Sequence, residues 1–171
     1  MRILVTSLAF ISATIFPQCF VRLANAVDVG QEGPSFTVKS VDGAPLQLND
    51  YSGKVIYLDI WASWCSACRQ SLPWMEELQS KYGDKGFQVI AVNVDEEREA
   101  ADNLLREKVK NLLVGFDPDG IVPQLYKASS MPSSYLIDRS GAIVSIHDRI
   151  NQSEMRRIEE EISKHLSKEP I

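Results

Sequence analysis

The chain has 171 residues, of which 44% are hydrophobic and 24% are charged. These proportions are typical of a soluble globular protein and argue against disorder, and the length suffices for one domain with its own core. There are 18 basic and 23 acidic residues, which give a net charge of −5. Nucleic-acid phosphates are bound by clustered lysines and arginines, whereas the basic residues here are scattered, so we expect no nucleic-acid binding.

The first 26 residues have the order of parts found in a secretory signal peptide. Arg2 is followed by the apolar run ILVTSLAFISATIF, and the small residues of ANA at 24–26 suit a cleavage site. We therefore expect a signal peptide at 1–26 and one mature domain at 27–171. The alternative is an uncleaved membrane anchor, but the apolar run is shorter than the roughly 20 residues that a spanning helix needs.

Removal of this segment would change both the charge and the cysteine count. Loss of Arg2 and Arg22 leaves 16 basic residues against 23 acidic ones, a net charge of −7. Loss of Cys19 leaves two cysteines, Cys65 and Cys68. A mature chain would therefore contain no disulfide beyond the one that this pair can form.

The first half of the mature chain predicts a hairpin, a buried strand and a helix. Two strand candidates, FTVKS at 36–40 and PLQL at 45–48, flank the turn VDG. The apolar, β-branched run KVIYLDIW at 54–61 is typical of a strand buried on both faces. Apolar residues at three- and four-residue steps then predict a helix over 65–82, which Pro73 should interrupt and kink.

The second half continues the alternation of strands and helices. We expect strands at 87–94 and 111–116, a solvated helix over 96–109 and a short helix around 122–126. A hairpin follows, with strands at 135–138 and 142–148 joined at RSG. The last helix has Asn151 as its N-cap and Glu154 three residues on. This order predicts a single α/β domain built as a three-layer α/β/α sandwich.

The sequence WCSAC places Cys65 and Cys68 three residues apart, directly after the apolar strand. A zinc site normally needs four ligands from two separated pairs, and His147 and His165 are better interpreted as ordinary surface or edge residues. A purely structural disulfide closing so small a loop would stabilise little. Redox chemistry is therefore the favoured interpretation, while copper binding by the two thiolates remains an alternative.

The position of the pair suggests a division of roles. Cys65 falls where a strand ends and a helix begins, and a helix N-terminus stabilises a thiolate. Cys68 lies one turn further in and is expected to be shielded. We therefore expect Cys65 to attack a partner's disulfide and Cys68 to resolve the mixed disulfide.

Asp59 is a carboxylate within the apolar strand that precedes the pair. Burial raises the pKa of a carboxyl group because it disfavours the charged form. An acid of this kind beneath the cysteines can take the proton from Cys68 as it attacks. The alternative is a half-exposed aspartate near the end of the strand.

The segment WASWCSACRQSLPWM resembles the active-site segment of the thioredoxin superfamily, and more narrowly that of the secreted TlpA/ResA-like thiol–disulfide oxidoreductases. MPSS at 131–134 is similar to the family's segment with a cis proline, which matches Pro132. The resemblance implies a thioredoxin fold with an N-terminal β-hairpin and a central α/β insertion. It also implies that a partner protein contacts four residues, namely Trp64, Ser66, Met131 and Pro132.

The same resemblance implies a function. It predicts a monomeric periplasmic reductase of protein disulfides, with no cofactor beyond the Cys65–Cys68 disulfide, a membrane thiol-electron donor and a candidate role in cytochrome c maturation. An oxidase, an isomerase or a copper-handling protein is the alternative. Two positions depart from the family pattern: Ala67 stands where many members have proline, and Ser71 where some have glutamate.

Overall fold

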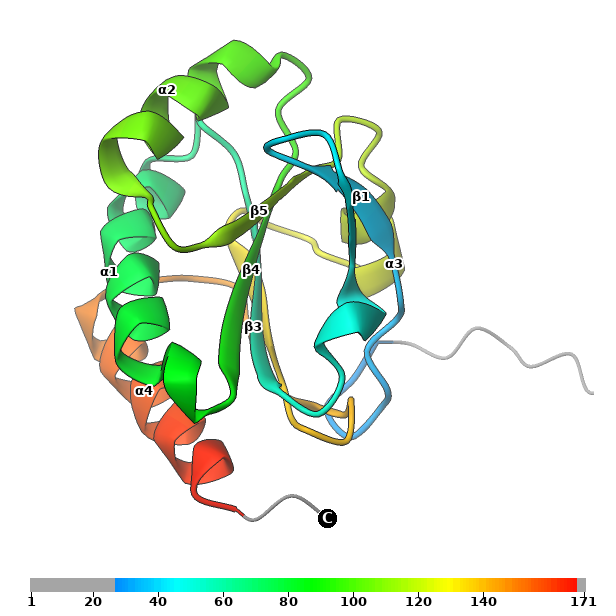
Figure 1. The fold of residues 1–171 in the computed structure, drawn as a ribbon, viewed down its shortest axis with the longest axis vertical. Coiled ribbons are helices and arrows are strands. Elements are labelled where there is room, and N and C mark those ends of the chain that lie inside the picture. The colour runs from blue at the N-terminus through cyan, green and yellow to red at the C-terminus, as the bar shows by residue number, and fades with distance from the viewer. Residues whose placement is uncertain (1–26, 169–171) are drawn as a thin grey trace, which may run out of the picture.

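The computed structural model of the protein describes residues 27–168, so the expected signal peptide at 1–26 lies outside the described residues. The chain forms three layers around one sheet (Figure 1). Helices α1 (Ser66–Tyr82), α2 (Arg98–Lys108) and α4 (Gln152–Leu166) cover one face, and α3 (Ile121–Tyr126) covers the other. The predicted α/β/α sandwich is therefore confirmed.

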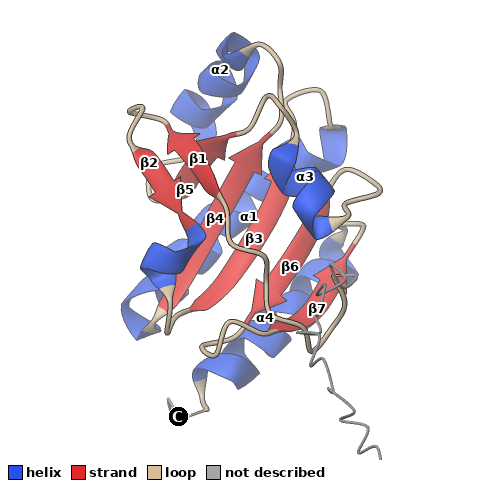
Figure 2. Cartoon of the chain, turned by 90° about the vertical axis from the view of Figure 1, so that its right-hand side faces the viewer, coloured by secondary structure: helices blue, strands red, loops and turns tan. Residues whose placement is uncertain are grey.

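The sheet has seven strands in the order β2-β1-β5-β4-β3-β6-β7, and Figure 2 shows them with α3 in front. The strands are β1 (Thr37–Ser40), β2 (Pro45–Gln47), β3 (Val55–Trp61), β4 (Phe87–Asn93), β5 (Leu113–Phe116), β6 (Ser133–Ile137) and β7 (Ile143–His147). The pairs β3–β4 and β4–β5 are parallel, whereas the other four pairs are antiparallel. Two short 3₁₀ helices, η1 (Leu48–Tyr51) and η2 (Gly83–Lys85), connect elements.

The two central strands are buried along their whole length, as their apolar composition predicts. Alternate residues of β3 point to opposite layers. Tyr57 and Trp61 pack under α1 and α4, while Leu58 and Ile60 face the layer that contains α3. Asp59 lies between Tyr57 and Trp61 in this alternation, so it faces the layer that contains α1.

Helix α1 begins one residue later than expected, because Cys65 is its N-cap and has an extended backbone conformation. The helix then runs without interruption through Pro73 to Tyr82. The prediction that Pro73 interrupts the helix was therefore wrong. Residues on the buried face of α1, including Leu72, Met75 and Leu78, hold it against the sheet on both sides of the proline.

Helix α4 begins after Asn151, whose side chain accepts a hydrogen bond from the Glu154 backbone N–H at 3.0 Å, so the predicted N-cap is confirmed. The Glu154 carboxylate binds His147 Nδ1 at 2.9 Å. His147 lies on the edge strand β7, as one of the two expected interpretations has it, but it is only 3% exposed and is not a surface residue. The hydrophobic pattern misled here, because on β7 the polar His147 faces inward under α4 while the apolar Ile146 faces solvent.

The topology brings one set of loops to a single edge of the sheet. The carboxyl ends of the parallel strands β3, β4 and β5 meet there. Strand β6 runs antiparallel to β3 with Ser133 opposite Ile60, so β6 begins at the same edge. The loop before Cys65, the residues after Asn93 and the residues before Ser133 are thereby neighbours. Within residues 27–168, no helix is long and apolar enough to cross a membrane.

Candidate active site

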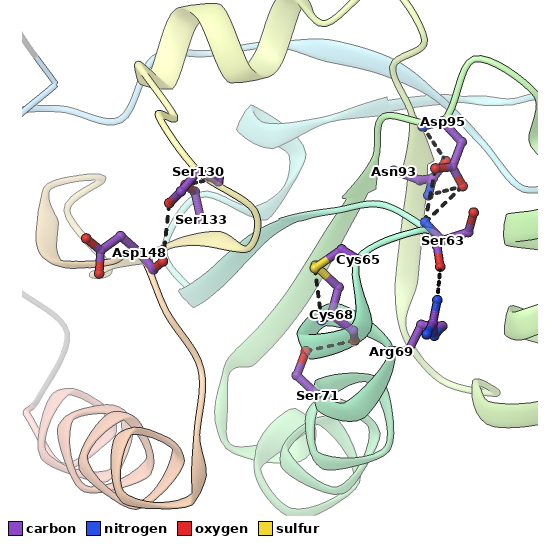
Figure 3. Close-up of a disulfide and its surroundings, with 10 residues drawn as sticks. All are labelled: Ser63, Cys65, Cys68, Arg69, Ser71, Asn93, Asp95, Ser130, Ser133 and Asp148. Carbon is purple, nitrogen blue, oxygen red and sulfur yellow. Dashed lines mark hydrogen bonds between the residues drawn. A yellow bond between two sulfur atoms is a disulfide. The ribbon is translucent and has the colours of Figure 1, made fainter.

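Cys65 and Cys68 are joined by a disulfide, with 2.09 Å between the sulfurs and 5.2 Å between the Cα atoms. The pair lies at the start of α1 (Figure 3). Cys68 is fully buried and Cys65 is 7% exposed. The expected order of exposure holds, but Cys65 is much less exposed than its position before the helix suggested.

The backbone at the start of α1 points a hydrogen-bond donor at the first sulfur. The Cys68 N–H donates to Cys65 Sγ at 3.1 Å, which is the bond of a helix N-cap. A donor at this position, together with the positive end of the helix dipole, stabilises a negative charge on the sulfur. The arrangement therefore favours the thiolate of Cys65 once the disulfide is reduced.

Asp59 is 2% exposed and lies on the face of β3 that α1 covers. Its Oδ2 atom has no protein hydrogen-bond partner, and burial raises the pKa of Asp59 to about 8. Its neighbours across the sheet are Ala91 on β4 and Ser134 on β6, neither of which carries a charge. The half-exposed alternative is thus excluded, while a role in proton transfer stays a prediction.

The loop between β3 and Cys65 is held at Ser63 by three side chains that the sequence patterns did not single out (Figure 3). The Asp95 carboxylate accepts from the Ser63 N–H at 3.0 and 3.1 Å. Asn93 Nδ2 donates to the same carboxylate at 3.1 Å. Arg69 Nη1 donates to the Ser63 carbonyl at 2.8 Å. The signal in the sequence was a polar pair, Asn93 and Asp95, at the carboxyl end of an apolar strand.

The second loop at this edge contains a cis peptide bond between Met131 and Pro132. Ser133 Oγ donates to the Ser130 carbonyl at 2.7 Å, and Ser130 Oγ donates to the Asp148 carbonyl at 3.2 Å (Figure 3). These bonds tie the loop to its own strand and to the residues after β7. The loop is therefore a fixed surface beside the end of β3.

The residues expected to contact a partner differ in exposure. Trp64 is 66% exposed, Ser66 is exposed, Met131 is partly buried and Pro132 is buried. An exposed tryptophan beside the cysteine pair offers a large apolar contact area, of the kind found at binding sites. Partner binding by these four residues stays a prediction.

Two further observations concern alternative chemistry. Within residues 27–168, no group of three or more His, Cys, Asp or Glu side chains is arranged to hold a metal ion. Ser71, where some relatives have glutamate, is buried and donates to the Cys68 carbonyl at 3.0 Å. It completes a turn of α1 and supplies no acid there.

The fold and the paired cysteines define a thioredoxin-fold protein with a redox-active disulfide. The chain belongs to the Redoxin family, whose model matches residues 28–162. It is 33% identical over 118 residues to the thiol-disulfide oxidoreductase ResA of Bacillus thuringiensis subsp. konkukian, covering 69% of this chain and 68% of the relative. It is 31% identical over 144 residues to ResA of Geobacillus kaustophilus, covering 84% of this chain and 82% of the relative.

Solved structures agree with this assignment. A protein of Chlorobium tepidum described as a thiol:disulfide interchange protein DsbE superposes with a TM-score of 0.80 at 41% identity, covering 83% of this chain and all of the other. A protein of Bacteroides thetaiotaomicron described as a protein disulfide isomerase superposes with a TM-score of 0.76 at 28% identity, covering 83% of this chain and 92% of the other. The predicted TlpA/ResA-like membership is confirmed, and the protein is a thiol–disulfide oxidoreductase.

Proposed function

We propose that the protein is a periplasmic reductase of protein disulfides, with Cys65 as the attacking thiol and Cys68 as the resolving thiol. The observation that carries this proposal is the asymmetry of the pair. Cys65 is the N-cap of α1 and receives a backbone N–H, whereas Cys68 is fully buried inside the first turn. The first sulfur is thus favoured as a thiolate, and the second is kept from outside partners.

The cycle follows from this arrangement. The Cys65 thiolate attacks one sulfur of the substrate disulfide, which forms a mixed disulfide and releases the first substrate thiolate. Cys68 then loses its proton and attacks Cys65, which closes the Cys65–Cys68 disulfide and releases the second substrate thiolate. The substrate gains two electrons and two protons, and the enzyme's pair loses them. An external thiol donor then reduces Cys65–Cys68 again.

Trapping of mixed disulfides tests the order of attack. Cys68→Ser should accumulate covalent adducts between Cys65 and substrate proteins, because the resolving thiol is missing. Adducts would be separated on non-reducing gels and identified by mass spectrometry. Cys65→Ser is the matched control and should trap none. Adducts of equal yield in both variants would refute the assigned order.

We further propose that Asp59 takes the proton from Cys68 during resolution. Its carboxylate lies in the layer covered by α1, and its pKa of about 8 suits proton uptake from a thiol near neutral pH. Resolution should therefore accelerate as the pH rises towards 8 and Asp59 ionises. Asp59→Asn should slow resolution on the order of a hundredfold and leave the first attack nearly unchanged. Stopped-flow measurement of both steps tests this, and equal resolution rates in both proteins would remove the role.

The direction of electron flow is proposed as reductive, with a membrane thiol-electron donor. The equilibrium constant with glutathione decides it, since thioredoxin-like potentials span about −270 to −120 mV. A value near the oxidising end would support the alternative of an oxidase or isomerase. The signal-peptide pattern at 1–26 supports a periplasmic location, and cytochrome c maturation is the candidate task there. Secretion of the full chain with cleavage after Ala26 is testable by N-terminal sequencing of the exported protein.

A further inference from the structure

We propose that Asp95 and Arg69 form a charged clamp on the backbone of Ser63, and that their opposite charges change the thiolate fraction of Cys65 in opposite directions. The clamp consists of these two side chains and the backbone N–H and carbonyl of Ser63. The proposal rests on Cys65 being the attacking thiol. Neither residue contacts the reacting sulfurs through an observed bond, so both are positioning residues.

The clamp holds Ser63 through both its N–H and its carbonyl. Both oxygens of Asp95 accept from the Ser63 N–H, and Arg69 holds the Ser63 carbonyl from the opposite side. The Asp95 side chain is itself fixed, because Asn93 Nδ2 donates to it at 3.1 Å and Asn93 Oδ1 accepts from the Asp95 N–H at 3.1 Å. Figure 3 shows Asn93 and Asp95 on one side of Ser63 and Arg69 on the other.

Burial makes the charges effective. Asp95 is 7% exposed, and Arg69 is partly buried. Both bond to the backbone of Ser63, whose Cα atom lies no more than about 7.6 Å from the Cα atom of Cys65. Charges that are partly buried interact through less solvent screening than exposed ones do. The negative Asp95 disfavours the Cys65 thiolate, whereas the positive Arg69 favours it.

The other groups around Cys65 do not cancel this effect. Asp59 on β3 faces the layer that contains α1, and this residue is unchanged in every variant of the test. The N–H groups at the start of α1 are backbone atoms and are also unchanged. A difference between variants therefore reports the removed charge.

The clamp explains why two ionised side chains bond to the backbone of one residue. Because both side chains are charged, Asp95 lowers the thiolate fraction of Cys65 and Arg69 raises it. Asp95→Asn removes the charge and keeps an acceptor oxygen for the Ser63 N–H. Arg69→Gln removes the charge and also shortens the side chain, so Arg69→Lys, which keeps the charge, is the variant that separates charge from the contact with the Ser63 carbonyl.

The test measures alkylation of Cys65 in the reduced full-length protein by iodoacetamide between pH 5 and 8, with the modified peptide quantified by mass spectrometry. Asp95→Asn should increase the rate at acidic pH by about three- to tenfold, and Arg69→Gln should decrease it by a similar factor. Arg69→Lys, which keeps the charge, should stay near the wild-type rate. The controls remove equivalent charges elsewhere: Asp84→Asn beyond the far end of α1 and Arg156→Gln on the exposed side of α4 should leave the rate unchanged.

The outcomes separate this inference from the proposed function. Faster alkylation in Asp95→Asn together with slower alkylation in Arg69→Gln supports the clamp, whatever the rate of the wild-type protein, and opposite shifts with these signs reversed would overturn it. Shifts in the same direction, or no shift in either, would overturn it, because a loop that is merely loosened changes Cys65 in one direction. The proposed function fails on a different result, namely a wild-type Cys65 that is no more reactive than free cysteine.

Discussion

Replacement of Asp59 by asparagine should change how the stability of the protein depends on pH. Burial raises the pKa of this carboxyl group from 3.8 to about 8, so between these values the folded state binds a proton that the unfolded state has released. The free energy of unfolding of the wild-type protein must therefore fall as the pH rises through this window. The slope is about 1.4 kcal/mol per pH unit, and it flattens above pH 8, where both states are ionised.

The variant lacks this titration, so the stability difference between the two proteins should grow with pH. From pH 5 to pH 8 the wild type should lose about 4 kcal/mol relative to Asp59→Asn. Urea unfolding of both oxidised proteins at pH 5, 6, 7, 8 and 9 measures the difference. Asp84→Asn, which removes an exposed carboxylate, is the control. Parallel curves for wild type and Asp59→Asn across this range would refute the reasoning that Asp59 is neutral in the folded protein at pH 7.

Two stability predictions concern single contacts. A Cβ atom at Gly115 would clash with Val38 Cγ2, so Gly115→Ala should lower the free energy of unfolding by about 1–3 kcal/mol. Adding Val38→Ala should recover part of that loss. If the effects of the two substitutions on the free energy of unfolding simply added, the clash would be contradicted. Asn151→Ala removes the side chain that caps α4 and should cost about 1 kcal/mol. Asn151→Ser is its control, because serine can accept the same bond, and equal losses for alanine and serine would show that the cap contributes little.

The elements that the sequence predicts best are those whose hydrophobic pattern has a single interpretation. Strands β3 and β4 are apolar along their length and match their expected ranges within one residue at each end. The hairpins β1–β2 and β6–β7 follow from turn residues between short strands. The cysteine pair follows from spacing alone, because two cysteines three apart at a helix start are close enough to bond.

The errors and omissions arise where tertiary contacts decide. His147 lies beside Ile146 on an edge strand, and hydrophobicity alone would place the isoleucine inside. Helix α4 instead covers the face that carries His147 and provides Glu154 as its partner. Ser63 and Asp95 are 32 residues apart, so their contact depends on β3 and β4 being parallel neighbours, which no local pattern reveals.

The site contains a buried carboxyl group that a protein selected only for stability would avoid. A carboxyl group buried without a charged partner destabilises the fold whenever it ionises, and Asp59 lies on a strand that is buried along its whole length. The same burial gives that group a proton affinity close to that of a thiol. Asp59→Asn should thus be more stable than the wild type at pH 8 and slower in resolution at the same pH. A variant that gained stability without losing resolution would show that the buried acid plays no part in the chemistry, and would leave Cys68 to lose its proton directly to water.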